Sequence, residues 1–243
     1  MILGRLVRAI VSVNDERHGP LPPLLLVLTL VTGLVDAVSY LALGHVFVAN
    51  MTGNVIFLGF AVADAQEFSI PASLVAMAAF LVGALLGGRL GTTVGNHRGR
   101  LFLITVWIEV GLMAATLAVA VAAPDTQRVE GHYGLIVLLA VAMGVQNATA
   151  RRLGVPDLTT TVLTLTLTGL AADSPLAGGN NPRPLRRITA AITMFLGAGI
   201  GAALLFRFGV AAVLAVALAL LGLTAMVSLR LRSSSAPWTK AAA

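Results

Sequence analysis

Two acidic residues and two polar clusters interrupt the apolar stretches of this sequence, and their residue types could do chemistry. Asp36 and Glu109 each lie inside a long apolar run. A carboxylate near the middle of a membrane helix costs roughly 2.5–3.5 kcal/mol on insertion scales, so such residues face the bundle interior and serve protons, ions or polar partners. Both acids are predicted to couple protons or ions, and a structural hydrogen bond to a neighbouring helix is the alternative for each.

The first polar cluster is Asn50-Met51-Thr52-Gly53-Asn54, and the second is the threonine-rich run over 159–168. Asn and Thr favour helix starts, where their oxygens cap free backbone N–H groups. A helix N-terminus buried at mid-depth would offer N–H donors and a positive dipole end to a polar or anionic solute. The alternative is that these side chains only satisfy the backbone of a re-entrant turn. The predicted substrate-binding residues are Asn50, Thr52, Asn54, Asn147, Thr160 and Thr164.

The residue types do not support thiol, metal or nucleophilic catalysis. The chain has no cysteine, which excludes a disulfide framework, thiolate catalysis and a Cys-ligated metal. Its four histidines show no metal-ligand spacing. No Gly-rich phosphate loop, nucleophile elbow or HExxH pattern occurs. We therefore expect no enzyme activity, no cofactor and no metal.

Composition indicates an integral membrane protein with the lipid bilayer as a partner. Hydrophobic residues make up 58% of the 243 and charged residues 11%, against about 25% charged in soluble domains. Several apolar stretches are long enough to cross a hydrocarbon core of roughly 30 Å. The net charge of +6 could suggest nucleic acid. The Arg and Lys residues lie between the apolar runs, however, as in cytoplasmic loops, so no nucleic-acid binding is expected.

The apolar pattern predicts an all-α polytopic fold with six long helices and two short segments. The long helices are expected over 23–43, 70–90, 101–123, 133–153, 187–206 and 209–230, and the short segments over 46–63 and 157–172. The short segments are too polar for lipid-facing spans. The run from Thr164 to Thr168 alternates with period two, which is a strand signal. An extended piece at membrane depth requires protein or a water-filled cavity around it.

The placement of the short segments follows from the 16 Lys and Arg residues. If both segments crossed the membrane, these residues would divide into 10 inside and 6 outside. If both segments are broken or re-entrant, 14 are cytoplasmic and only Arg128 and Arg207 are external. The positive-inside rule prefers the second division. We therefore expect both termini in the cytoplasm, a cytoplasmic basic amphipathic segment at 1–22, an external loop at 124–132 and a cytoplasmic tail at 233–243.

The two halves, 23–123 and 133–232, resemble each other. Gly33-Leu34-Val35-Asp36-Ala37 matches Gly144-Val145-Gln146-Asn147-Ala148, and a short segment follows each motif. Three crossings per half would reverse the second half, which predicts a 3+3 inverted repeat of the kind used by transporters; chance similarity of Gly- and Ala-rich helices is the alternative. Glycines spaced by four at 83, 87 and 91 and at 197 and 201 predict close helix packing, and they leave a homo-oligomer open.

Two stretches resemble the hallmark motifs of the YoaK family of bacterial inner-membrane proteins. The first is Thr32-Gly33 with Asp36-Ala37, followed by Phe47-Val48-Ala49-Asn50-Met51-Thr52-Gly53-Asn54. The second is Gly144-Val145-Gln146-Asn147-Ala148 followed by Thr159-Thr160-Thr161. The resemblance covers roughly residues 24–230. It implies a plasma-membrane protein of about six helices, and it does not identify a substrate.

These observations together predict a secondary transporter or channel for a small polar or anionic solute. The two short segments would meet near the midplane, with Asp36 as the coupling group. The alternative is a non-transporting membrane protein that partners or regulates another membrane complex. Polar groups around a cavity would favour the first function, whereas a filled centre with an exposed Gly face would favour the second.

Overall fold

The computed structural model describes residues 17–122, 129–161, 163–180 and 183–240, and over these residues the chain is helical without a strand. The predicted all-α class is confirmed. Most of the predicted amphipathic segment at 1–22 lies outside the described residues, as does most of the predicted external loop at 124–132.

Six of the described helices are long and apolar enough to cross a membrane, as predicted. Their ends differ from the predicted ends by a few residues. They are α2 (Leu21–Ala42), α4 (Ile70–Val94), α5 (Arg98–Ala122), α6 (Val129–Leu153), α8 (Pro184–Phe208) and α9 (Val210–Ser228).

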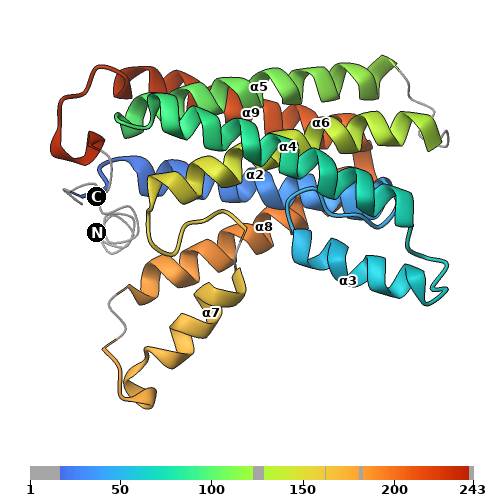
Figure 1. The fold of residues 1–243 in the computed structure, drawn as a ribbon, viewed down its shortest axis with the longest axis horizontal. Helices are drawn as coiled ribbons and strands as arrows, with labels where there is room; N and C mark the ends of the chain where they lie inside the picture. The colour runs from blue at the N-terminus through green and yellow to red at the C-terminus, as the bar shows by residue number, and fades with distance from the viewer. Residues whose placement is uncertain (1–16, 123–128, 162, 181–182, 241–243) are drawn as a thin grey trace.

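The two short segments form helices too short to span a membrane, α3 (Met51–Val62) and α7 (Leu163–Ala172). Each begins near the middle of the bundle's length and runs outward, and the two point toward opposite ends of the molecule (Figure 1). Before α3, residues 43–50 run back from the end of α2 toward the middle, with Val46, Val48 and Ala49 buried. The predicted broken or re-entrant character of both segments agrees with this path.

The strand predicted from the period-two run between Thr164 and Thr168 is wrong, because these residues lie in α7. A helix satisfies its backbone hydrogen bonds within one segment. A single strand leaves two edges of N–H and C=O groups without partners, which costs several kcal/mol per group away from water. That cost outweighs the side-chain alternation, so the short segment is helical.

The cationic residues gather at one end of the bundle, where α2, α5 and α8 start and α4, α6 and α9 end (Figure 1). We call this the cationic end. Among the described residues only Arg207 lies at the opposite end, which agrees with the predicted division of charge. The cationic end holds Arg17, Arg89, Arg98, Arg100, Arg151, Arg152, Arg183, Arg186, Arg187, Arg230, Arg232 and Lys240.

Arg98, the first residue of α5, joins distant parts of the chain at the cationic end. Its guanidinium donates to the carbonyls of Arg17 (2.8 Å), Trp238 (3.0 Å) and Leu153 (2.6 Å). The side chain is buried, with 4% exposed. Hydrogen bonds to a charged donor are stronger than neutral ones, so Arg98 holds the first and last described segments against the end of α6.

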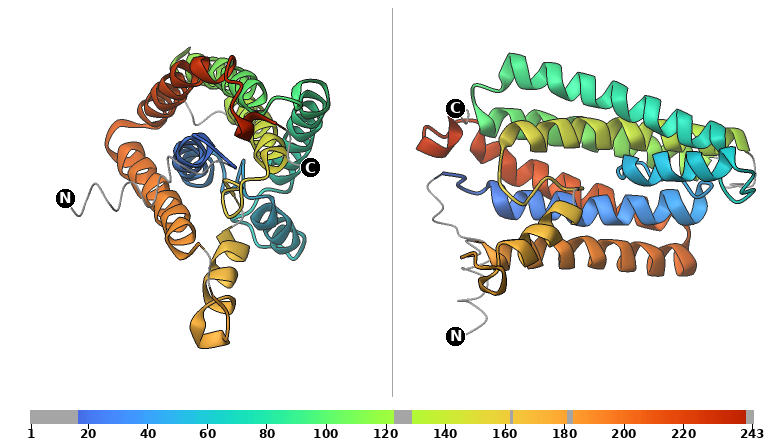
Figure 2. Two further views of the ribbon diagram at one scale, coloured as in Figure 1. Left: turned by 90° about the vertical axis from the view of Figure 1, so that its left-hand side faces the viewer. Right: turned by 60° about the horizontal axis from the view of Figure 1, so that its bottom comes forward.

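Helix α2 lies at the centre of the bundle, enclosed by the other long helices (Figure 2). It packs along α8, and glycines on both helices let the two backbones come close together. A methyl group on Gly33 would lie 2.7 Å from the Met194 carbonyl, and one on Gly197 would clash with the Leu30 carbonyl. Only small residues allow two helix backbones to approach this closely, so the spacing of glycines by four is explained by packing inside the chain.

Helices α4 and α6 form a second pair of the same kind. A methyl group on Gly144 would clash with the Phe80 carbonyl, and one on Gly83 would clash with the Val141 carbonyl. Gly87 likewise meets Val145. The glycine faces of α4 and α8 are therefore occupied within the chain. A homo-oligomer stays a prediction, and it would need other faces.

The two helix pairs correspond contact by contact. The motif aligns Gly33 with Gly144, and the glycine spacing aligns Gly197 with Gly83. With this alignment, each contact in one pair has a counterpart between the aligned positions of the other pair. The equivalent contacts are Gly33–Met194 with Gly144–Phe80, Gly197–Leu30 with Gly83–Val141, and Gly201–Leu34 with Gly87–Val145.

We expect Gly83→Ala and Gly197→Ala to destabilise the protein, because each new methyl group meets a backbone carbonyl that cannot move aside. Overpacking of this kind costs about 1–3 kcal/mol. Gly88→Ala and Gly199→Ala are the matched controls, since nothing lies within 4 Å of a methyl group at either position. Thermal denaturation in detergent measures the difference. Equal melting temperatures for all four variants would contradict the packing.

Candidate solute site

A cavity of about 760 Å³ lies where the N-termini of α3 and α7 meet. We call it the central cavity. Helix α2 contributes Gly33 and Asp36 to its wall, and α8 contributes Met194 and Ala198. The polar side chains on its wall are Asp36, Asn50, Thr52, Thr161 and Thr164. Residues from both halves of the chain therefore surround one space.

Asp36 holds the chain that leads into α3. Its Oδ1 accepts hydrogen bonds from the backbone N–H groups of Val48 (3.3 Å) and Ala49 (3.0 Å). Both N–H groups belong to irregular backbone inside the bundle, where no helix partner is available. The other oxygen, Oδ2, makes no hydrogen bond within the part of the chain that the structure describes. Asp36 thus supports the turn with one oxygen and presents the other to the central cavity.

Two asparagines start α3 and have different roles. Asn50 is the N-cap residue, and its side-chain oxygen accepts from the N–H of Gly53. Asn54 is fully buried and closes the turn: its Oδ1 accepts from Phe47 N–H (2.8 Å) and its Nδ2 donates to Phe47 C=O (2.6 Å). Asn50 lines the central cavity, whereas Asn54 does not.

Aromatic side chains hold the body of α3 against the end of α2. The rings of Phe47 and Phe57 stack with centroids 5.6 Å apart, and Phe57 stacks on Phe68 at 4.7 Å. Tyr40, near the end of α2, stacks on Phe47 at 5.0 Å. Such pairs contribute about 0.5–1.5 kcal/mol each beyond their buried area, so this cluster fixes α3 without any charge.

Ion pairs hold α7 in the second half. Asp157, in the segment before α7, pairs with Arg183 and Arg187, each at 3.0 Å. Arg187 also pairs with Asp173 (2.8 Å) and donates to the Gly169 carbonyl. The network joins both ends of the short segment to the start of α8. The two short helices are thus fixed by different chemistry.

Asn147, the counterpart of Asp36, lines a second cavity. Its Nδ2 donates to the Met143 carbonyl, and its Oδ1 accepts from the hydroxyl of Thr161. The second cavity has a volume of about 740 Å³ and lies between α4 and the end of α6, toward the cationic end. Arg151 and Arg152 line it, so we call it the arginine cavity. Phe80 lines both cavities, and the Asn147–Thr161 bond lies between them.

Glu109 lies in neither of these cavities. Its side chain is fully buried on α5, and both carboxyl oxygens lack a hydrogen-bond partner among the described residues. The hydroxyls of Thr105 and Thr149 bond at 2.8 Å and set the register of antiparallel α5 and α6. Gln146 Oε1, on α6, is also buried without a hydrogen-bond partner among the described residues.

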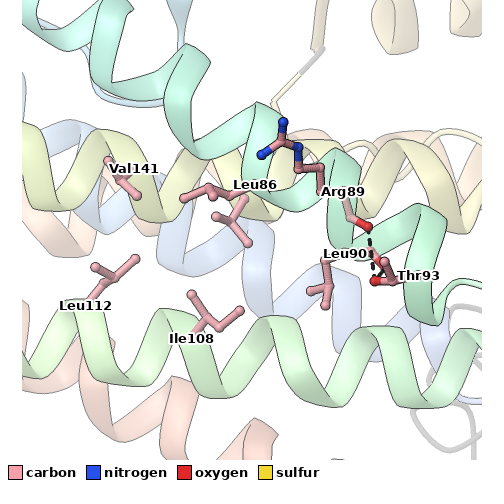
Figure 3. A pocket seen from close by; sticks show the side chains of 8 residues that line it. Leu86, Arg89, Leu90, Thr93, Ile108, Leu112 and Val141 are labelled. Carbon is pink, nitrogen blue, oxygen red and sulfur yellow. Dashed lines mark hydrogen bonds between the residues drawn. The ribbon is translucent and has the colours of Figure 1, made fainter.

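Thr160 faces a void of about 10 Å³, and its hydroxyl is buried without a partner among the described residues. Its backbone has a φ of 64°, a left-handed value that bulky residues rarely adopt. A further cavity, of about 410 Å³, opens between α4 and α5 (Figure 3). Leu86 and Leu90 face Ile108 and Leu112 across it, with Arg89 at its rim. Its apolar lining suits a lipid chain better than a polar solute.

Comparison with known proteins places the chain in a family. A family model described as "Protein of unknown function (DUF1275)" matches residues 24–227. The chain belongs to this family. It is 35% identical over 150 residues to the UPF0700 transmembrane protein YoaK of Bacillus subtilis strain 168. That match covers 62% of this chain and 65% of the relative. No solved structure matches.

The DUF1275 match confirms the resemblance to YoaK that the sequence motifs indicated. It extends from the first turn of α2 almost to the end of α9, so both cavities lie within the region common to the family. The comparisons support a transmembrane protein and assign it no function.

Of the predicted site residues of this DUF1275 chain, the structure brings four together around the central cavity: Asp36, Asn50, Thr52 and Thr164. Asn54 is buried in the first turn of α3, and Thr160 is buried in the segment before α7. Asn147 lines the arginine cavity, and Glu109 lines neither of the two cavities. Thr161 and Phe80 were missed. Thr161 could have been found from its alignment with Asn50, whereas nothing in the sequence singles out Phe80.

We expect Asp36→Asn to fold almost as well as the wild type, because the amide oxygen can still accept from Val48 and Ala49. Asp36→Ala leaves two buried N–H groups without an acceptor, which costs about 1–3 kcal/mol for each. Thermal denaturation in detergent compares the variants, with the exposed Glu67→Ala as the control. If Asp36→Ala melted at the wild-type temperature, the support of the turn by Asp36 would be disproved.

Proposed function

We propose that this DUF1275 protein is a secondary transporter or channel for a small polar or anionic solute, bound in the central cavity. The observation that carries the proposal is the meeting of two short helices at this cavity. The first N–H groups of a helix have no partner within the helix, and their dipoles are positive. Two such ends facing one space, with Asn50, Thr52 and Thr164 beside them, would suit a solute with oxygen acceptors.

We also propose an inverted repeat, in which α2–α5 and α6–α9 are two copies of one unit. The equivalent glycine contacts of the α2–α8 and α4–α6 pairs support it. Helices α3 and α7 point in opposite directions, as expected if the copies are inverted (Figure 1). In transporters of this design the solute site lies at the interface of the repeats, between broken helices.

The two cavities fit alternating access. The central cavity and the arginine cavity are similar in volume and lie against corresponding parts of the two repeats. Phe80 and the hydrogen bond between Asn147 and Thr161 separate them. A relative movement of the repeats that displaces these side chains would let a solute pass from one cavity to the other.

Asp36 is the coupling group that the geometry favours. Its Oδ2 borders the central cavity, where a proton or cation could reach it, whereas Glu109 borders neither cavity. The alternative function, as a partner or regulator of another complex, predicted a filled centre and an exposed glycine face. Here the cavity is open, and Gly83, Gly87, Gly197 and Gly201 lie against neighbouring helices.

The flux of solutes and protons in proteoliposomes tests the proposal. Wild-type protein should take up at least one solute from a panel of small anions and polar molecules, at a rate that depends on pH. Asp36→Asn should remove the pH dependence, since the amide cannot carry the proton. Glu67→Gln is the control, because this exposed acid lies away from both cavities.

Two results would count against this assignment. Normal pH-dependent flux by Asp36→Asn would eliminate Asp36 as the coupling group. A folded wild type that carries nothing from a broad panel would favour the partner function instead.

We further propose that the chain lies in the bacterial inner membrane with both termini in the cytoplasm. The cationic end, which holds Arg17 and Lys240, would face inward according to the positive-inside rule. A reporter fused at Lys240 should be active only in the cytoplasm, and one inserted at Asp125 only outside. Activity of the Lys240 fusion on the external side would refute this topology.

A further inference from the structure

The arginine cavity contains two cations that no acidic side chain neutralises among the residues that the structure describes. Arg151 and Arg152 end α6, and both side chains are exposed. Neither makes a hydrogen bond or an ion pair in the part of the chain that the structure describes. The other polar side chains on the wall are those of Asn147 and Thr159, and no acid lines the cavity.

The position of Arg152 depends on two glycines of the α4 terminus. A methyl group on Gly91 would lie 3.3 Å from Arg152 Cγ, and one on Gly95 would lie 3.3 Å from Arg152 Nε. The stem of Arg152 therefore rests on backbone that carries no side chains. This contact places the guanidinium at the cavity and limits the directions in which it can turn.

Neighbouring arginines at the same end have partners within the chain. Arg98 binds three backbone carbonyls, and Arg183 and Arg187 pair with Asp157. Arginines at a membrane surface often anchor a helix through lipid headgroups. Arg151 and Arg152 differ from a simple anchor because they line a cavity together with an amide and a hydroxyl.

We infer that the arginine cavity is a binding site for an oxyanion, a carboxylate or phosphate group held by Arg151 and Arg152. Guanidinium groups donate in a planar fork that matches the oxygens of these groups. The hydroxyl of Thr159 would add a further donor. The oxyanion could belong to a solute or to a lipid headgroup. If the proposed function holds, this site is where an anionic solute binds on the cytoplasmic side, which narrows the solute class to anions.

Equilibrium binding to the purified, folded protein tests the inference without any transport step. Inorganic phosphate, sulfate and acetate are titrated calorimetrically into the wild type, Arg151→Gln, Arg152→Gln and Arg230→Gln. Arg230 is the matched control, since it is exposed at the same end and lines neither cavity. We expect at least one probe to bind the wild type and to bind each cavity variant about tenfold or more weakly, the loss of one charged hydrogen bond. Arg230→Gln should bind normally.

The source of the oxyanion is resolved by repeating the titration in lipid nanodiscs. Discs of phosphatidylcholine alone are compared with discs that also contain phosphatidylglycerol. Binding that persists in both indicates a free solute, and binding that phosphatidylglycerol abolishes indicates a lipid headgroup. The inference is overturned if no probe binds in phosphatidylcholine discs, or if Arg230→Gln weakens binding as much as the cavity variants. Because binding needs no gradient, this result is independent of a failure to detect flux.

Discussion

The fold depends on the cost of bringing irregular backbone into a region without water. Every N–H group that enters the bundle outside a helix needs an acceptor from the protein. Asp36 supplies it for Val48 and Ala49, and Asn54 supplies it for Phe47. With these bonds made, the chain can turn at mid-depth and start α3 there. The central cavity exists because the chain turns at this depth and leaves the first turn of α3 facing open space.

The two halves solve the same problem with different chemistry. In the first half a carboxylate supports the turn and stacked aromatic rings hold the short helix. In the second half the corresponding residue is Asn147, and ion pairs of Asp157 with Arg183 and Arg187 hold the short helix. Aromatic contacts respond little to salt, whereas partly exposed ion pairs are screened. Salt should therefore weaken the attachment of α7 more than that of α3.

Much of the fold could be predicted because membrane spans follow from apolar length, and the short segments follow from their polar content. The motif around Asp36 also located the central cavity. The roles of individual polar residues were harder to predict. Thr52 and Asn54 are two positions apart, yet one borders the cavity and the other closes a turn, because α3 turns them to different sides. The period of the run from Thr164 gave the wrong element, since hydrogen bonding of the backbone outweighs side-chain alternation.

The arginine cavity could not be predicted, because it arises from the pairing of α4 with α6. Arg151 and Arg152 at a helix end are ordinary membrane anchors in sequence terms. Only the contact with Gly91 and Gly95, which lie far away in the sequence at the end of α4, shows that the Arg152 side chain has a defined position. Contacts between segments far apart along the chain decide such sites, and no local pattern encodes them.

The exchange of helix partners between the halves has a consequence for biosynthesis. Helix α2 packs along α8, and α4 packs along α6. A ribosome delivers α2 to the membrane first, but its glycine face remains without its partner until most of the chain has been translated. Neither half can complete its own packing, so the nascent first half must wait in the bilayer, with its polar turn unprotected by the second half. Quality control in the membrane would therefore meet a half-assembled intermediate during every round of synthesis.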